Sequence, residues 1–194
     1  ICPQMIKAEQ QTIRASESGF IEHGLFGWVN ICDLIYYTDV KLGDPIFEEQ
    51  KRAYIEFPEW TDLREHSSWH IVNAYLKLYV TDASDDISII ISNLSALWPA
   101  SCKIQNTSLR HDYGGSQIYS AMSTGTVLGS LSGLVPTGWN TFHLNVRELQ
   151  SLYGDSCKSL HKMWIGLFDP TDNADEVYAK GYDQAESPTL VIEY

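Results

Sequence analysis

The clearest signal in the chain is an alternation of apolar and polar residues with a period of two, which predicts half-buried β-strands. Residues 72–80 show it best. There, the positions expected to face the core are Ala74, Leu76, Leu78 and Val80, and those expected to face outward are Tyr75, Lys77 and Tyr79. Residues 52–57, 138–146 and 188–194 alternate in the same way. Each of these segments is therefore predicted to be a strand with one buried face.

Shorter or less regular segments complete the predicted set of strands. They cover residues 11–15, 19–21, 34–37, 87–91 and 164–168. Residues 147–153 are predicted to form a short helix, which Gly154 ends at its C-terminal cap. The polar stretch 101–132, rich in Gly, Ser and Thr, is expected to hold loops and edge strands.

Many strands, one short helix and no regular alternation of the two predict an all-β fold. We expect an antiparallel β-sandwich or jelly roll with one short helix near 147–153. A chain of 194 residues fits one domain with a substantial core. Residues 11–194 are predicted to form that domain, and residues 1–10 an N-terminal extension.

Charge restricts the partners that this chain can have. It carries 25 Asp and Glu against 13 Lys and Arg, which gives a formal net charge of −12. This charge argues against nucleic acid and anionic membrane surfaces as partners. No apolar run approaches the roughly 20 residues that span a bilayer. We therefore predict no nucleic-acid partner and no membrane insertion.

The four cysteines favour an oxidising compartment. Cys2, Cys32, Cys102 and Cys157 are too scattered for a zinc site, and an even count in an acidic β-protein favours two disulfides over four buried thiols. Three pairings stay open, among them Cys2–Cys32 with Cys102–Cys157. The start at Ile1 rather than Met is typical of a mature product whose signal peptide has been removed. We expect an extracellular protein.

Two further features accompany that expectation. Asn93 and Asn106 each begin an Asn-x-Ser/Thr tripeptide and are candidate glycosylation acceptors in a secreted protein. The acidic segment 169–176 is a candidate Ca²⁺ site, because Ca²⁺ prefers carboxylate and amide oxygens on a bending backbone. Its candidate ligands are Asp169, Asp172, Asn173, Asp175 and Glu176. A solvated acidic loop is the alternative interpretation.

No motif indicates catalysis. The sequence holds no G-x-S-x-G, no H-E-x-x-H and no phosphate-binding glycine loop, and the six histidines show no metal-ligand spacing. We predict a non-enzyme. Aromatic residues are abundant, and flat aromatic rings can stack on sugars or anchor protein interfaces. Candidates for such stacking are Trp28, Trp60, Trp98 and Tyr113, with burial in the core as the alternative.

The order of these segments resembles the disaggregatase-related (DNRLRE-type) β-sandwich modules of secreted bacterial and archaeal proteins. The resemblance rests on residues 12–21, 52–57, 72–80, 139–153, 177–182 and 188–194, and covers most of the chain. The family's namesake acidic-and-basic motif is not present as such, and the 101–132 stretch is longer than expected. The resemblance implies a jelly-roll-like sandwich without catalysis, some of whose members bind acidic polysaccharides.

Two functional hypotheses follow. The first is a structural or adhesive subunit that assembles with copies of itself into an extracellular filament or surface layer. Its N-terminal segment, with Ile1, Pro3, Met5 and Ile6, would lie along a neighbour's sheet edge. The alternative is a carbohydrate-binding module for extracellular polysaccharide, which exposed aromatic residues gathered on one face would favour.

Overall fold

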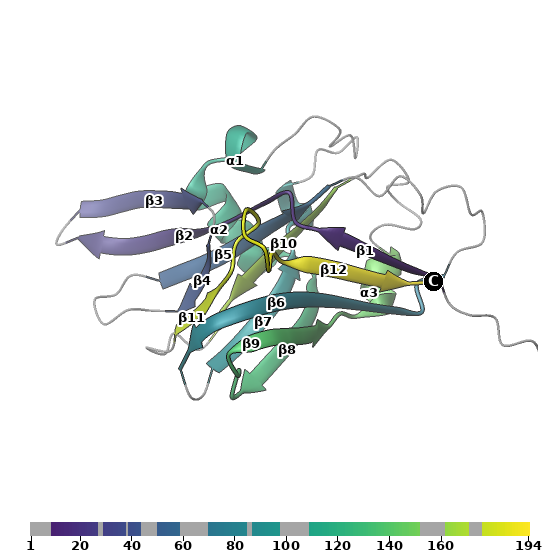
Figure 1. Cartoon of the computed structure of the whole chain (residues 1–194). Coiled ribbons are helices and arrows are strands. Elements are labelled where there is room, and N and C mark those ends of the chain that lie inside the picture. The colour runs from purple at the N-terminus through teal and green to yellow at the C-terminus, as the bar shows by residue number, and fades with distance from the viewer. Residues whose placement is uncertain are drawn as a thin grey trace, which may run out of the picture.

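A computed structural model gives the fold of the chain (Figure 1). The structure describes residues 9–26, 29–37, 39–43, 50–58, 70–84, 87–97, 109–151, 162–170 and 176–194. The strands, all paired antiparallel, are β1 (Gln10–Arg14), β2 (Glu17–Phe26), β3 (Val29–Tyr37), β4 (Val40–Gly43), β5 (Gln50–Phe57), β6 (Asn73–Ala83), β7 (Ile87–Asn93), β8 (Val127–Gly133), β9 (Gly138–His143), β10 (Met163–Phe168), β11 (Glu176–Ala179) and β12 (Thr189–Glu193). The helices are α1 (Leu109–Asp112), α2 (Gly115–Thr124) and α3 (Val146–Gln150), with a 3-10 turn η2 (Ser95–Leu97).

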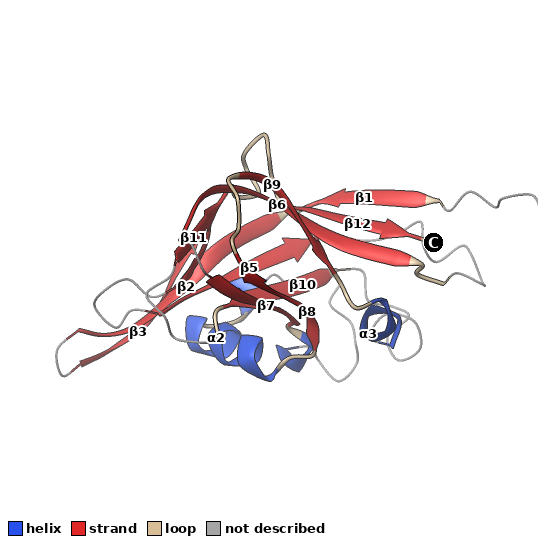
Figure 2. Cartoon of the chain, turned by 90° about the horizontal axis from the view of Figure 1, so that it is seen from below, coloured by secondary structure: helices blue, strands red, loops and turns tan. Residues whose placement is uncertain are grey.

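One continuous sheet curls over on itself to make a sandwich-like body, which confirms the all-β prediction (Figure 2). Strands β3, β2, β5, β10, β7 and β8 form one layer, which we call the covered layer. The other, the open layer, is centred on β6, with β9 along one edge and β12 and β11 along the opposite edge. Strand β1 extends it beyond β12, and β4 beyond β11. A single pair, Gly43 with Lys51, links β4 to β5 and so joins the layers.

The core lies between the two layers and is apolar because each strand turns its apolar positions inward. In β6, Ala74, Leu76, Leu78 and Val80 are buried, as the alternation predicts. Phe142 on β9 is buried as well, and so is Leu144 beyond it. Burial of aliphatic and aromatic side chains on this scale is the main stabilising contribution to the fold.

Strand β5 departs from the predicted pattern, since it is buried on both faces. Ala53, Ile55 and Phe57 face the core as predicted, yet Tyr54 and Glu56 are also buried. The reason is that α2 lies on the outer face of the covered layer (Figure 2), and that the Leu109 amide of α1 donates to the Glu56 carboxylate on the same face. The sandwich therefore has a third, helical layer on one side only.

The helical layer corrects the sequence prediction for residues 101–132. We expected loops and edge strands there and a single helix near 147–153. Strand β8, which begins in this stretch, lies at an edge of the sheet as expected, but α1 and α2 are helices that the sequence did not predict. Helix α2 packs closely because Gly166 on β10 carries no side chain: a Cβ there would lie 2.5 Å from Met122 Cγ. The single predicted helix near 147–153 is confirmed as α3 over Val146–Gln150, and its N-cap Asn145 accepts hydrogen bonds from the Arg147 and Glu148 amides.

The N-terminal boundary also differs slightly from the prediction. The Glu9 amide donates to the Tyr194 carbonyl at 2.9 Å, and the Tyr194 amide donates back at 3.0 Å. Gln10 then opens β1, which pairs with β12 throughout. Glu9 and Gln10 thus belong to the sheet and not to the predicted extension.

Candidate functional site

The outer face of the open layer carries the most distinctive group of side chains in the described part of the chain. Across β6 and β9, three outward pairs lie directly opposite one another. They are Tyr75 with His143, Lys77 with Thr141, and Tyr79 with Trp139. Facing residues in an antiparallel pair share one side of the sheet, so these six side chains form a single strip. We call it the β6–β9 strip.

One end of the strip is an aromatic corner. The rings of Tyr79 and Trp139 meet edge to face, with centroids 5.6 Å apart and planes at 89°. Edge-to-face contact is a favourable aromatic geometry, so each ring restrains the other. Trp139 nevertheless keeps 52% of its surface exposed. The Trp139 ring is therefore exposed to solvent while its contact with Tyr79 restrains its orientation.

The other end repeats this geometry. Tyr75 and His143 also meet edge to face, with centroids 5.5 Å apart and planes at 89°. The Tyr75 hydroxyl donates to the carboxylate of Glu193 on β12 and accepts from the Asn73 amide. The hydrogen bond to Glu193, together with burial, raises the pKa of Tyr75 above its ordinary value. These contacts fix the position of the Tyr75 ring.

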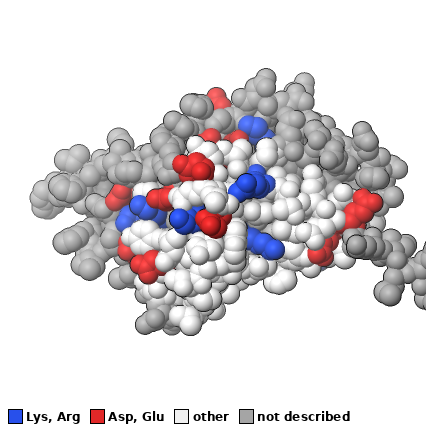
Figure 3. All heavy atoms as spheres, viewed as in Figure 1, with Lys and Arg blue, Asp and Glu red and all other residues white. Residues whose placement is uncertain are grey.

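The middle of the strip is polar but carries a single charge. Lys77 lies between Thr141 on β9 and Thr189 on β12. Among the described residues, Lys77 makes no ion pair. Figure 3 shows where charged side chains lie on this face of the molecule. Strand β9 contributes no Lys, Arg, Asp or Glu, and the Glu193 carboxylate lies beside Tyr75 at one end of the strip. On a chain with a net charge of −12, this is a nearly neutral area.

A second polar group stands where the two layers join. Glu176 Oε1 pairs with Lys51 Nζ at 3.3 Å, and Glu176 Oε2 accepts from the Tyr178 hydroxyl at 2.8 Å. Lys41 Nζ lies 5.6 Å from the centre of the Tyr178 ring and 4.8 Å from that of Phe20. The Lys51–Glu176 pair joins β5 to β11, and Lys41 on β4 contacts both Phe20 on β2 and Tyr178 on β11. The group therefore has a structural explanation.

This corner predicts a response to alkaline pH. Burial and then the hydrogen bond to Glu176 raise the pKa of Tyr178 from 10.0 to about 12. A pKa above the unfolded value means that this network stabilises the fold below pH 10 and loses that contribution as the pH rises towards 12. In Tyr178→Phe, we expect the rise of tyrosinate absorbance near pH 12 to be smaller by the contribution of one phenol. Stability should also depend less on pH in this range; an unchanged titration curve would contradict the assignment.

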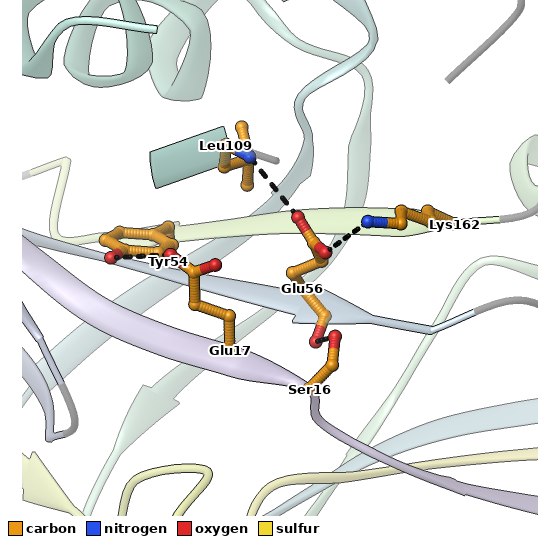
Figure 4. A network of polar contacts seen from close by, with 6 residues as sticks. All are labelled: Ser16, Glu17, Tyr54, Glu56, Leu109 and Lys162. Carbon is orange, nitrogen blue, oxygen red and sulfur yellow. Dashed lines mark hydrogen bonds and ion pairs between the residues drawn. The ribbon is translucent and has the colours of Figure 1, made fainter. Parts of the chain in front are cut away.

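A third polar group is buried beneath the helices (Figure 4). Glu56, only 3% exposed, pairs with Lys162 Nζ at 2.9 Å and accepts from the Leu109 amide at 3.3 Å. Its backbone carbonyl accepts from both the amide and the hydroxyl of Ser16. Both carboxylate oxygens thus already bind protein donors, and the network attaches α1 to the sheet.

The same face of β5 carries two further contacts of this kind. The Tyr54 hydroxyl lies 3.4 Å from Glu17 Oε1, as Figure 4 shows. Arg52 lies 3.7 Å from the centre of the Tyr119 ring and donates to the Tyr119 carbonyl at 2.9 Å. Arg52 thus fastens α2 to β5. These groups hold the helical layer in place and leave the β6–β9 strip as the best candidate site.

The predicted calcium ligands are only partly described. Asp172, Asn173 and Asp175 lie outside the described residues. Asp169 follows the end of β10, and the carboxylate of Glu176 is already engaged by Lys51 and Tyr178. Within the described ranges, no group of three or more His, Cys, Asp or Glu side chains could hold a metal ion. Calcium binding by this loop stays a prediction.

Burial corrects one of the two predicted glycosylation sites. Asn93 ends β7 with its side chain 0% exposed. A glycan on that amide has no path to solvent in the folded protein, so we withdraw Asn93 as an acceptor. Asn106 lies outside the described residues.

Of the four residues predicted to stack on sugar rings, only Tyr113 is described by the structure. The Tyr113 hydroxyl donates to the Leu97 carbonyl at 2.5 Å, and its ring meets that of Trp164 edge to face at 5.7 Å. Tyr113 is therefore a half-buried packing residue between η2, α2 and β10, and not a platform for a ligand. Trp28, Trp60 and Trp98 lie outside the described residues.

The cysteines and the N-terminal segment stay as predicted hypotheses. Cys2, Cys102 and Cys157 fall outside the described residues, and Cys32 lies in β3, where the backbone alone is described. The proposed self-assembly residues, which are Ile1, Pro3, Met5 and Ile6, also fall outside. None of the helices in the described part of the chain is long and apolar enough to cross a membrane.

Sequence reasoning did not identify the β6–β9 strip. It did predict that Tyr75, Lys77 and Tyr79 face away from the core. The missing step was the register of β9 against β6, which sets Trp139 and His143 beside these tyrosines. No local pattern gives that register. No protein-family model matches the chain and no curated protein matches its sequence, so the resemblance to DNRLRE-type modules stays a prediction.

Proposed function

We propose that this protein is a non-catalytic carbohydrate-binding module that recognises neutral polysaccharide through the β6–β9 strip. The observation that carries the proposal is the exposed Tyr79–Trp139 pair, since aromatic faces pack well on the apolar faces of sugar rings. The strip combines such rings with hydroxyl and ammonium groups able to bind sugar hydroxyls. A binding role outside the cell agrees with the cysteine content of the chain.

Two features favour sugar over other occupants of the strip. The strip is half polar, so it lacks the continuous apolar area that marks a large protein interface. Its near neutrality on an acidic chain also disfavours polyanions, which the net charge of −12 would repel. The self-assembly hypothesis rests on residues 1–8, which are not described, so no observation here favours it over glycan binding.

The test is binding to a panel of soluble neutral polysaccharides, including xylan, mannan, β-glucan and galactan, measured by retardation in affinity gel electrophoresis. We expect the wild-type protein to be retarded by at least one of them. Trp139→Ala should lose about 2 kcal/mol of binding free energy, roughly a 30-fold weaker association, as for a central aromatic contact. Trp139 is half exposed, so the variant should keep its fold and its unfolding midpoint.

Val127→Ala is the matched control. Val127 is 50% exposed but lies on β8, a strand of the covered layer, and its truncation should leave retardation unchanged. Failure of the wild-type protein to bind any member of the panel would exclude the proposed function. Equal binding by Trp139→Ala and wild type would place the sugar site elsewhere on the molecule.

A further inference from the structure

The spacing of the two aromatic pairs defines the length of ligand that can use both. Tyr75 and Tyr79 are four residues apart on β6. At about 3.3 Å per residue, the two pairs are about 13 Å apart along the strand. One sugar ring is too short to contact both pairs. A ligand that touches both ends of the strip must therefore be a chain of several rings.

The centre of the strip defines what the middle of that chain must offer. The Lys77 ammonium group is a donor only, whereas the Thr141 hydroxyl can donate and accept. Both side chains lie between the aromatic pairs on the same face. A sugar ring placed there presents hydroxyl oxygens as acceptors and hydroxyl hydrogens as donors. The strip thus alternates a stacking position, a hydrogen-bonding position and a second stacking position.

Resting on the proposed function, we infer that the ligand is a linear, neutral oligosaccharide segment of three or more sugar rings lying along β6. One ring contacts Tyr79 and Trp139, the next hydrogen-bonds Lys77 and Thr141, and the third contacts Tyr75 and His143.

The test uses oligosaccharide ladders of one to six units derived from xylan, mannan and cellulose, titrated into the protein by calorimetry. We expect no detectable binding of the monosaccharide, an affinity at least about tenfold higher for three units than for two, and little further gain beyond that. Equal affinity for one unit and for six would overturn the chain-length inference but leave glycan binding intact. Absence of binding by every ladder and polysaccharide would instead remove the proposed function itself.

A variant at one end of the strip sharpens the result. His143→Ala should weaken binding of three or more units by about tenfold and leave binding of two units unchanged, if two units occupy the Trp139 end. Val127→Ala, on β8 of the covered layer, should bind every ladder like wild type. An equal loss with Val127→Ala and with His143→Ala, or no loss with His143→Ala, would contradict the second stacking position.

A salt series distinguishes a neutral ligand from an acidic one. Binding of the neutral ladders should change little between 20 and 500 mM NaCl, roughly the range over which screening becomes strong. Lys77→Gln should keep part of the affinity, since an amide still donates hydrogen bonds. Preferential binding of polygalacturonate or alginate with a steep fall in salt would identify Lys77 as a carboxylate anchor and overturn the neutral assignment.

Discussion

Replacement of Lys162 by methionine is expected to lower the free energy of unfolding by about 3 kcal/mol. Lys162 pairs with Glu56, whose side chain is only 4% exposed, at a distance of 2.9 Å. Methionine keeps most of the aliphatic stem but removes the ammonium group. Of the two groups that donate to the buried Glu56 carboxylate, the Lys162 ammonium group is then lost and the Leu109 amide remains. Urea-induced unfolding followed by tryptophan fluorescence measures the change.

Lys51→Met is the matched control for this ion pair. Lys51 pairs with Glu176, whose side chain is 26% exposed and which also accepts from the Tyr178 hydroxyl. The carboxylate left behind is partly hydrated and still hydrogen-bonded, so we expect a loss below about 1 kcal/mol. Equal losses in the two variants would show that burial of Glu56 does not set the contribution of its ion pair.

The strands of this fold could be predicted from the sequence because their signal is local. In β6 the buried Leu76 and Leu78 alternate with Tyr75 and Lys77 over a long segment, and the structure keeps that pattern. Alternation with a period of two belongs to the strand itself and needs no knowledge of its neighbours. In β12, Leu190 and Ile192 are buried as expected, but Val191 between them is buried as well, so the alternation is only partly kept there.

Helix α2 could not be predicted in this way. Its sequence is rich in Gly, Ser and Thr, which have weak intrinsic helix propensity. The helix forms because it buries Ile118 and Met122 against the outer face of the covered layer, where α2 contacts β3, β7 and β10. That face, with Tyr54 and Trp164, is in turn buried only because the helix covers it. The sequence of α2 alone therefore does not predict the helix, and the sequences of the strands alone do not predict that their outer face is buried.

The candidate site shows the same limit. The outward orientation of Tyr79 follows from alternation in β6, but its contact with Trp139 depends on the pairing of two strands separated by a long stretch of sequence. Helices cover the outer face of one layer and leave that of the other exposed (Figure 2). This asymmetry explains why the open layer carries the exposed aromatic residues, since large apolar groups on the covered layer are buried instead.

Replacement of Gly125 by alanine is expected to lower the free energy of unfolding by about 3 kcal/mol, because overpacking against backbone forces the backbone to move. Gly125 is the C-cap of α2, where its amide donates to the Ala121 carbonyl at 2.9 Å. A Cβ at this position would lie 1.9 Å from the Asn93 carbonyl oxygen and 3.0 Å from the Asn93 carbonyl carbon. Rotation of a side chain cannot relieve a clash with backbone.

The other end of the same helix provides the control. Gly114 is the N-cap of α2, and a Cβ there would meet Gln117 Oε1 at an ordinary 3.7 Å. Gly114→Ala should therefore lose less than about 1 kcal/mol, the cost of a poorer cap. Gly125→Ala should also weaken the near-ultraviolet circular dichroism of Trp164, since a displaced α2 exposes the face that Trp164 shares with Tyr113. Similar losses in both variants would mean that α2 adapts at its C-terminal end. In that case the close approach of Gly125 to the Asn93 carbonyl would not determine the position of α2 on the sheet.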